Sequence, residues 1–241
     1  MLPITVDGTT IPESPGNITI DGTDVTEVTV DGTAVWTANA IPASGLLHNY
    51  DWSDGTTTTS TVPDLAGSTD LTGTFTDLTA TINGVQAGTF DGNNDVVDGD
   101  FADISQPYTI FTVARARAVD TDQYFYDGWS NRALFRYDNS DDAWDIYSGS
   151  TLQGSAGDTN AHLWTMEYNG ASSAIRVDSA ADASGDAGTL ALDGLTVPQD
   201  SGKLVSPGAV DVGQIAVYNP DASGYSRSDV EDYFTGKWGP F

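Results

Sequence analysis

The sequence predicts an all-β protein, namely a jelly-roll sandwich with one C-terminal helix, preceded by a small β-hairpin segment. Three observations carry this prediction. Short runs of alternating apolar and polar residues, separated by turn residues, recur from residue 47 onward. An Asp-Gly motif repeats within the first 38 residues, and an amphipathic helical pattern appears only near the C-terminus. These observations divide the chain into a segment 1–38, a linker 39–46 and a domain 47–241.

The N-terminal segment contains one motif three times. Residues 4–11 (ITVDGTTI), 18–25 (ITIDGTDV) and 28–36 (VTVDGTAVW) are each a β-branched run interrupted by Asp-Gly. Asp-Gly favours the tight turn of a hairpin, because both residues tolerate positive φ. We therefore expect three small hairpins over residues 1–38. Isolated two-stranded hairpins are only marginally stable, so we expect this segment to attach to a partner or to its own copies.

The main domain reads as a series of strands at short intervals, which is typical of a sandwich or jelly roll. The clearest predicted strands cover residues 108–115, 133–137, 143–147, 162–168, 174–177 and 212–218.

One helix closes the chain. Ser226 is the expected N-cap, and Gly236 is the expected residue at which the helix ends. The spacing i, i+3, i+4 gives the helix one apolar stripe, and Trp238 is expected to pack back on the sheet. The stripe consists of Val230, Tyr233 and Phe234.

The charge balance is strongly acidic. Lys and Arg total 8 against 35 Asp and Glu, which gives a formal net charge of −27. Such self-repulsion destabilises a compact protein at low ionic strength and is screened by molar salt, so the composition favours a halophilic source. Without a basic patch to neutralise phosphates, nucleic acid is excluded as a partner. There is no cysteine, which excludes a disulfide scaffold, and no apolar run approaches the roughly 20 residues that span a bilayer.

Several motifs occur in the order in which they appear in a known family. They are an opening strand at 47–51 (LHNYD), the segment 88–97 (GTFDGNNDVV), the strand 162–170 (HLWTMEYNG), and a terminal strand and helix that run from 213–219 (GQIAVYN) to 233–239 (YFTGKWG). With these motifs, residues 47–241 resemble the concanavalin A-like lectin/glucanase superfamily in its LamG-like form. The family usually has Val-Asp-Gly where this chain has Val177, Asp178 and Ser179.

The resemblance also implies a candidate metal site. Asp91, Asn93 and Asp95 offer oxygen ligands at alternating positions, and members of the family often hold calcium near such loops. Calcium prefers six to eight oxygen ligands. The alternative is an ordinary turn in which the same side chains bond the local backbone.

The segment 25–36 (VTEVTVDGTAVW) resembles leader segments of surface proteins of tailed viruses. This resemblance implies a virion-surface protein that is assembled in the host cytoplasm and is extracellular after release. The expected partners are other virion proteins, bound through residues 1–38, and a host surface glycan or S-layer glycoprotein. Together with the acidity, it suggests a homo-oligomeric protein of a haloarchaeal tailed virus.

Enzymatic activity is not expected. Glycosidases of the resembled superfamily use two glutamates close together on one strand, whereas Glu167 stands alone on its predicted strand. The aspartate pairs are expected to be solvated surface groups. His48 and His162 both fall on predicted strands, where a structural role is the expected one.

Sugar binding requires an aromatic platform beside carboxylates and amides. The stretches 123–132 (QYFYDGWSNR) and 141–147 (DDAWDIY) supply both. Alternation places Tyr124 and Tyr126 on one face of the first stretch and Phe125 on the other. The candidate contacts are Tyr126, Trp129, Asn131 and Trp144; the alternative is that these aromatic side chains fill the core.

The sequence therefore predicts a non-enzymatic virion-surface protein, of the capsid turret, spike or tail-fibre type, that mediates adhesion to host glycans. Two alternatives remain. The protein is a purely structural virion oligomer without sugar binding, or it is a fragment of a cellular extracellular lectin or glycoside hydrolase.

Overall fold

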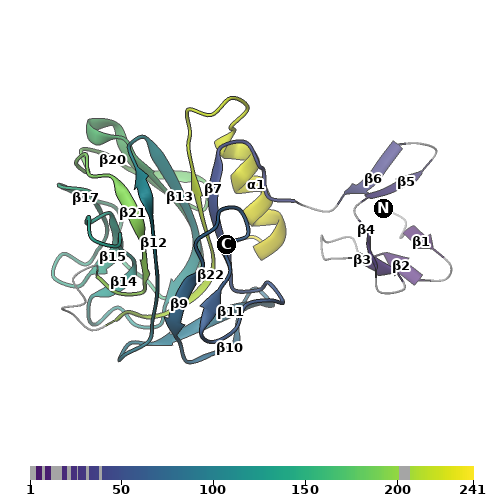
Figure 1. The fold of residues 1–241 in the computed structure, drawn as a ribbon, viewed down its shortest axis with the longest axis horizontal. Helices are drawn as coiled ribbons and strands as arrows, with labels where there is room; N and C mark the ends of the chain where they lie inside the picture. Colours follow the sequence, from purple (N-terminus) through teal and green to yellow (C-terminus); the bar gives the residue numbers. More distant parts are fainter. Residues whose placement is uncertain are drawn as a thin grey trace.

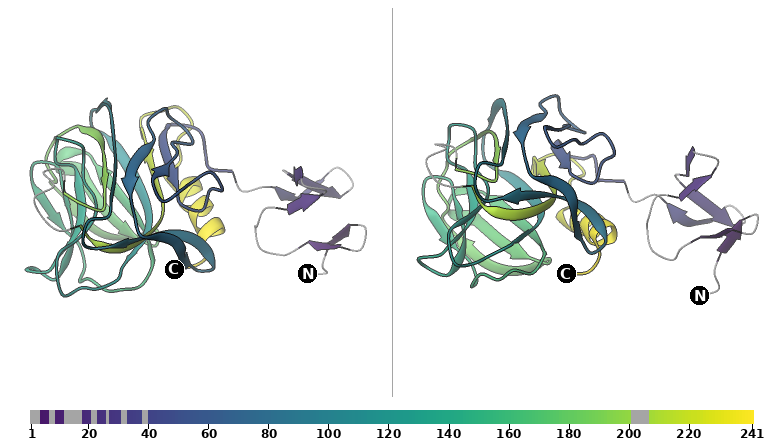
Figure 2. Two further views of the ribbon diagram at one scale, coloured as in Figure 1. Left: turned by 60° about the horizontal axis from the view of Figure 1, so that its bottom comes forward. Right: turned by 90° about the horizontal axis from the view of Figure 1, so that it is seen from below.

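The structure is a computed structural model. It describes six short strands within residues 1–39, and all of residues 40–200 and 207–241. In this part of the chain almost every element is a β-strand, and the two main layers pack face to face (Figures 1 and 2).

The larger layer is an eight-stranded antiparallel sheet. Its order is β10-β11-β22-β13-β18-β19-β20, and β7 also pairs with β22. The last strand in the chain, β22, thus lies inside the sheet between β13 on one side and β11 and β7 on the other. The strands are β7 (Leu46–Asp51), β10 (Asp77–Ile82), β11 (Val85–Asp91), β13 (Tyr108–Ala116), β18 (His162–Tyr168), β19 (Ser173–Val177), β20 (Ala180–Gly185) and β22 (Ala209–Tyr218). A short 3-10 turn, η1 (Gly170–Ser172), joins β18 to β19.

The second layer consists of two four-stranded sheets, in the orders β21-β12-β9-β8 and β14-β15-β16-β17. A bridge between Asp127 and Thr196 connects them, with backbone hydrogen bonds of 2.8 and 3.0 Å. The strands are β8 (Thr61–Val62), β9 (Leu71–Thr74), β12 (Val96–Ile104), β14 (Gln123–Tyr126), β15 (Leu134–Asp138), β16 (Ala143–Tyr147), β17 (Thr151–Gln153) and β21 (Leu192–Val197).

The core between the layers is rich in aromatic rings. Trp164 of the large sheet packs against Trp144 and Phe135 of the second layer, with ring centroids 4.7 and 5.0 Å apart. These side chains are almost completely buried, because alternate residues of each strand face inward. The predicted jelly-roll sandwich is confirmed, and each of the six clearest predicted strands overlaps an observed one.

Helix α1 (Arg227–Trp238) covers the outer face of the large sheet (Figure 1). Ser226 caps it as predicted, with its side chain accepting a hydrogen bond from the Asp229 N–H. The predicted end at Gly236 is wrong. The helix continues to Trp238, and Gly239, at φ 85°, takes the terminal position. The helix thus includes two more residues than expected, of which Trp238 is completely buried, and we attribute the extension to this burial. Among the described residues no helix is long and apolar enough to cross a membrane.

The three N-terminal repeats form three antiparallel strand pairs, as predicted. The pairs are β1 (Ile4–Val6) with β2 (Thr9–Ile11), β3 (Ile18–Ile20) with β4 (Thr23–Val25), and β5 (Glu27–Val30) with β6 (Thr33–Thr37). The Asp-Gly turns between the strands lie outside the described residues. The division into 1–38, 39–46 and 47–241, and an attachment role for the first segment, stay predictions.

Two local details differ from the sequence pattern. A register shift, or β-bulge, lies between Tyr124 and Tyr126, so Phe125 and Tyr126 both enter the core and the expected strict alternation is wrong there. The β19–β20 hairpin forms without the usual glycine. Asp178 and Ser179 adopt φ values of 51° and 67° at its turn.

Candidate functional site

A small pocket lies on the outer face of the β14–β17 sheet, opposite the core. Register aligns one row of residues across the four strands, in which Tyr124 lies beside Arg136, Arg136 beside Asp145, and Asp145 beside Gln153. The neighbouring row pairs Tyr147 with Leu134 and with Thr151. Because their strand neighbours Phe135, Trp144 and Ile146 face inward, these side chains face out.

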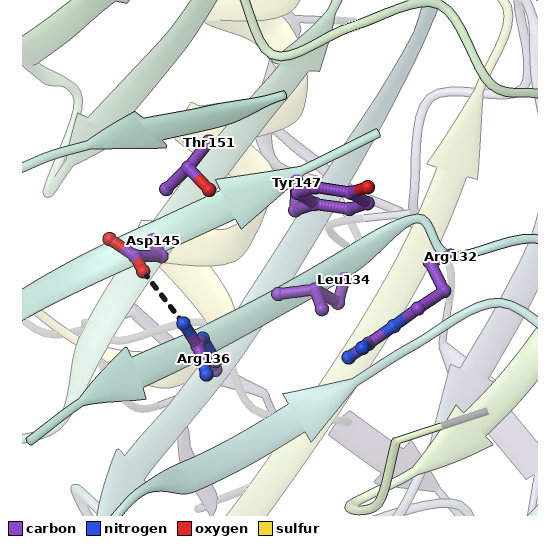
Figure 3. A pocket seen from close by; sticks show the side chains of 6 residues that line it. All are labelled: Arg132, Leu134, Arg136, Asp145, Tyr147 and Thr151. Atoms are coloured by element: carbon purple, nitrogen blue, oxygen red, sulfur yellow. Dashed lines mark hydrogen bonds and ion pairs between the residues drawn. The ribbon is translucent and has the colours of Figure 1, made fainter. Parts of the chain in front are cut away.

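The pocket has a volume of about 230 Å³, which suits a single small polar ligand. Two arginines, a carboxylate, a phenol and a hydroxyl surround its apolar floor. Figure 3 shows Arg132 on the loop before β15 and the other side chains on neighbouring strands. The lining residues are Arg132, Leu134, Arg136, Asp145, Tyr147 and Thr151.

Arg136 is held at the centre of a set of carboxylates. It forms an ion pair with Asp138, lies 3.3 Å from Asp145 (dashed in Figure 3), and lies 3.6 Å from Asp122. Its guanidinium also lies 5.9 Å from the centroid of the Tyr124 ring. Contacts on several sides fix the position of its guanidinium at the edge of the pocket.

Arg132 is positioned by the loop between β14 and β15. The fully buried carboxylate of Asp127 accepts a hydrogen bond from Arg132 Nε at 3.1 Å. The loop itself is held by Asp193 of β21, whose carboxylate accepts hydrogen bonds from the backbone N–H groups of Trp129, Ser130 and Asn131 at 2.9–3.1 Å. The guanidinium of Arg132 lies 6.0 Å from the Tyr147 ring centroid, so an aromatic face and a cation share one side of the pocket.

Asp145 lines the pocket with a buried carboxylate, so the expectation that the aspartate pairs are solvated surface groups is wrong for this residue. Only 1% of its side chain is exposed, and its Oδ1 has no hydrogen-bond partner among the described residues. Burial raises the pKa of Asp145 to about 6; Arg136 acts in the opposite direction, and Asp138 adds to the rise. Asp145 therefore lines the pocket with a carboxylate of which one oxygen, Oδ1, is buried and left unsatisfied by the described residues.

The four predicted sugar contacts fall in two places. Tyr126 and Trp144 lie in the core beneath the pocket, and the Tyr126 hydroxyl is 3.1 Å from that of Tyr168. Trp129 and Asn131 are partly exposed, on the loop that carries Arg132. A direct ligand contact by any of the four stays a prediction. The two core residues support the pocket from below and do not line it.

Sequence reasoning missed the residues that line the pocket, although its two stretches contain several of them. Residues 143–147 alternate, so one face carries Trp144 and Ile146 and the other carries Asp145 and Tyr147. Each face carries an aromatic ring, so the sequence alone does not show which face is buried in the core and which could contact a ligand. The signal that could have decided between them is the pairing of Asp145 with Arg136 on the next strand.

The predicted calcium residues form a hydrogen-bonded turn. The Asp91 carboxylate accepts hydrogen bonds from the backbone and side-chain nitrogens of Asn93 at 2.8 and 3.1 Å. Asp95 Oδ2 accepts from the backbone N–H groups of Thr76 and Asp91. Among the described residues there is no group of three or more His, Asp or Glu side chains arranged to hold a metal ion. Calcium binding by Asp91, Asn93 and Asp95 stays a prediction.

The histidines and the strand glutamate are engaged in structural contacts. His48 bonds Asp64 at 2.7 Å and stacks on Phe101 with ring centroids 4.0 Å apart. His162 lies between Asp178 and Asp158, which together raise its pKa although burial opposes the charged form.

Glu167 lies 3.3 Å from Arg227, which also bonds Glu231 of the same helix at 2.7 Å. The contacts of Glu167 therefore fix helix α1 against β18.

Comparison with known proteins finds relatives by structure but not by sequence. No protein-family model matches the sequence, and no curated protein sequence matches it. The structure is similar to Trypanosoma rangeli sialidase in complex with 2,3-difluorosialic acid, with a TM-score of 0.61 at 13% identity over 88% of this chain. The same sialidase in complex with sialic acid gives a TM-score of 0.57 at 11% identity over 88% of this chain. In both cases the chain spans 36% of the sialidase.

A weaker likeness, with a TM-score of 0.47 at 12% identity, joins 79% of this chain to 98% of domain 4 of an extracellular arabinanase from Geobacillus stearothermophilus. At these identities the comparison with the sialidase shows the fold alone, an antiparallel β-sandwich.

Proposed function

We propose that this protein is a non-catalytic glycan-binding module, and that the pocket formed by Arg132, Leu134, Arg136, Asp145, Tyr147 and Thr151 is its binding site. The observation that carries this proposal is the composition of the pocket on a sandwich of the lectin type. Guanidinium, carboxylate and hydroxyl groups surround an aromatic ring on a rigid sheet face. This is the combination that a sugar ring requires, because its hydroxyls need oriented polar partners and its C–H face needs an apolar surface.

The setting of the pocket supports the same proposal. Its polar groups come from paired strands and from a loop fixed by Asp193, so little conformational entropy is lost when a ligand binds. The pocket is shallow and small, so each site would bind weakly. Useful affinity would come from several copies that act together.

We further propose that the module is displayed on the surface of a virion of a halophilic virus, where residues 1–38 join it to other virion proteins and to its own copies. The three strand pairs within residues 1–38 support an attachment role, because such pairs are marginal without a partner. The net charge of −27 supports a high-salt environment. The sugar would then belong to a host surface glycan or an S-layer glycoprotein.

A glycan array, incubated with the purified full chain in high salt, tests the binding site. Wild type is expected to bind at least one class of surface glycan. Tyr147→Ala removes the aromatic surface and should weaken that binding at least about tenfold, equivalent to roughly 1.4 kcal/mol. Leu65→Ala is the matched control, because Leu65 is 45% exposed and lies outside the pocket. A blank array for wild type, or equal binding by Tyr147→Ala, would overturn the proposal.

The comparison with sialidase favours a second candidate, a module of a larger cellular carbohydrate-active protein, because the chain spans only 36% of that enzyme. Light scattering in about 2–3 M salt, at which surface charges are screened, distinguishes the two candidates. A closed oligomer that dissociates when residues 1–38 are removed supports the virion appendage. A monomer both with and without them supports the free module.

A further inference from the structure

The charges around the pocket are unequal. Arg132 is paired with Asp127, and Arg136 is in contact with Asp122, Asp138 and Asp145. Two cations thus meet four carboxylates, within a protein whose net charge is −27. The positive charge of both arginines is already compensated. An incoming carboxylate would therefore be repelled by the acidic groups without finding an unpaired guanidinium.

Asp145 also has a requirement that only some ligands can meet. Its Oδ1 is buried and lacks a donor among the described residues, which costs free energy as long as the carboxylate is ionised. Because Oδ1 is buried, a sugar hydroxyl in the pocket can donate a hydrogen bond to it only after rotation about the soft terminal torsion of Asp145 turns this oxygen toward the ligand. The same hydroxyl can accept a hydrogen bond from Arg136. An ionised sugar carboxylate at that position can only accept.

We propose that the pocket selects uncharged sugars over sugars that carry a carboxylate, and that Asp145 is the residue that determines this specificity. This inference rests on the proposed function. Thr151 and Tyr147 add two hydroxyl groups, so the whole lining is matched to a neutral polyol.

The experiment is an array that pairs neutral polysaccharides with carboxylated counterparts, namely mannan with mannuronan, and methyl-esterified galacturonan with galacturonan, all at one salt concentration. Wild type should bind the neutral member of a pair at least about tenfold better. Asp145→Asn removes the charge with little change in shape, and the preference should then fall to about threefold or less. Asp232→Asn is the matched control: it makes the same change in net charge at an exposed position of helix α1, away from the pocket, and it should keep the wild-type preference.

The pH dependence of wild type gives a second measurement, which does not depend on the folding of a variant. The groups that face Asp145 are Arg136, Asp138 and Asp141, and burial raises the pKa of Asp145 itself to about 6. Lowering the pH from about 8 to about 5 should therefore protonate Asp145 while sugar carboxylates stay ionised. The preference of wild type should shrink, and that of Asp145→Asn should not change.

The outcomes separate this inference from the function on which it rests. Equal or stronger binding of the carboxylated members by wild type would leave glycan binding intact and overturn the specificity. A preference that survives in Asp145→Asn would overturn the role of Asp145. Failure of wild type to bind any neutral or acidic member, on this array and on the surface-glycan array, would overturn the proposed function itself.

Discussion

At the scale of single residues, many of the aspartates stabilise turns by accepting hydrogen bonds from the nearby backbone. One pattern recurs, in which an Asp carboxylate accepts a hydrogen bond from the backbone N–H two residues later. It occurs at Asp51, Asp54, Asp77, Asp91, Asp138 and Asp158. Only the shorter acidic side chain reaches its own backbone in this way, so the turns select aspartate over glutamate. The acidity therefore serves local structure as well as the solvent-facing surface.

The turn between β19 and β20 leads to a prediction. Ser179 holds a positive φ of 67° on an exposed position, a conformation that costs an L-residue other than Gly or Asn roughly 1 kcal/mol. Ser179→Gly should therefore raise the free energy of unfolding, by up to about 1 kcal/mol, in urea denaturation followed by fluorescence. Ser184→Gly, at an exposed position within β20, is the control and should lower it instead. Destabilisation by Ser179→Gly would contradict the strain argument.

At the scale of the elements, the alternation of apolar and polar residues predicts the bounds of a strand better than it predicts which side chains face the core. Strand β16 was predicted at its observed bounds, because 143–147 is a short alternating run between turn residues. Its inward face could not be chosen, since Trp144 and Tyr147 are both aromatic and lie on opposite faces. Trp144 faces the core because it packs against Trp164, which lies 20 residues further along the chain.

The prediction of the binding residues has the same limit, because the sequence does not show which face of each strand is exposed. The mixture of aromatic and polar residues identifies two stretches that supply part of the pocket, but none of the four residues chosen in them lines it. The loop that carries Arg132 is fixed by Asp193 of β21, 64 residues after Trp129 in the chain. A single sequence read locally does not contain such contacts. Arg132 is held at the site by that loop, whereas Arg136 reaches it through the adjacent strand β16, where it pairs with Asp145.

The junction of helix and sheet gives the second prediction. Gly213 lies under Trp238, and a Cβ at position 213 would meet the ring at 2.7 Å. Gly213→Ala should force the buried ring out of place and destabilise the protein by about 1–3 kcal/mol in thermal or urea unfolding. Gly55→Ala is the matched control, because a Cβ there meets nothing within 4 Å. Equal stability of the two variants would mean that the helix end can move without cost.

At the scale of the whole molecule, negative charge exceeds what the available cations can balance. Six of the eight cationic side chains already form ion pairs in the described residues: Arg115, Arg132, Arg136, Arg176, Arg227 and Lys237. The remaining acid repels itself, and added salt screens that repulsion.

Stability should consequently rise with salt. We expect the Tm, measured by calorimetry between about 0.1 and 3 M KCl, to increase most below about 1 M, where the Debye length shortens to about 3 Å. Each 1 kcal/mol gained should raise the Tm by roughly 2–4 °C for a chain of this size. A triple variant of the exposed residues Asp100, Asp103 and Asp232 to Asn should show a smaller increase than wild type. An identical salt dependence in the two proteins would contradict the charge argument.

The position of β22 in the large sheet has a consequence for how the protein is made. His48 near the start of the domain is in register with Val217, and Ile110 pairs with the same residue from the other side. On the ribosome, β7 and β13 therefore emerge long before the strand that separates them. Until residues 209–218 have left the exit tunnel, the large sheet is incomplete and apolar faces of its strands are exposed. A topology of such high contact order folds slowly, and newly made chains should depend on chaperones until that strand is inserted.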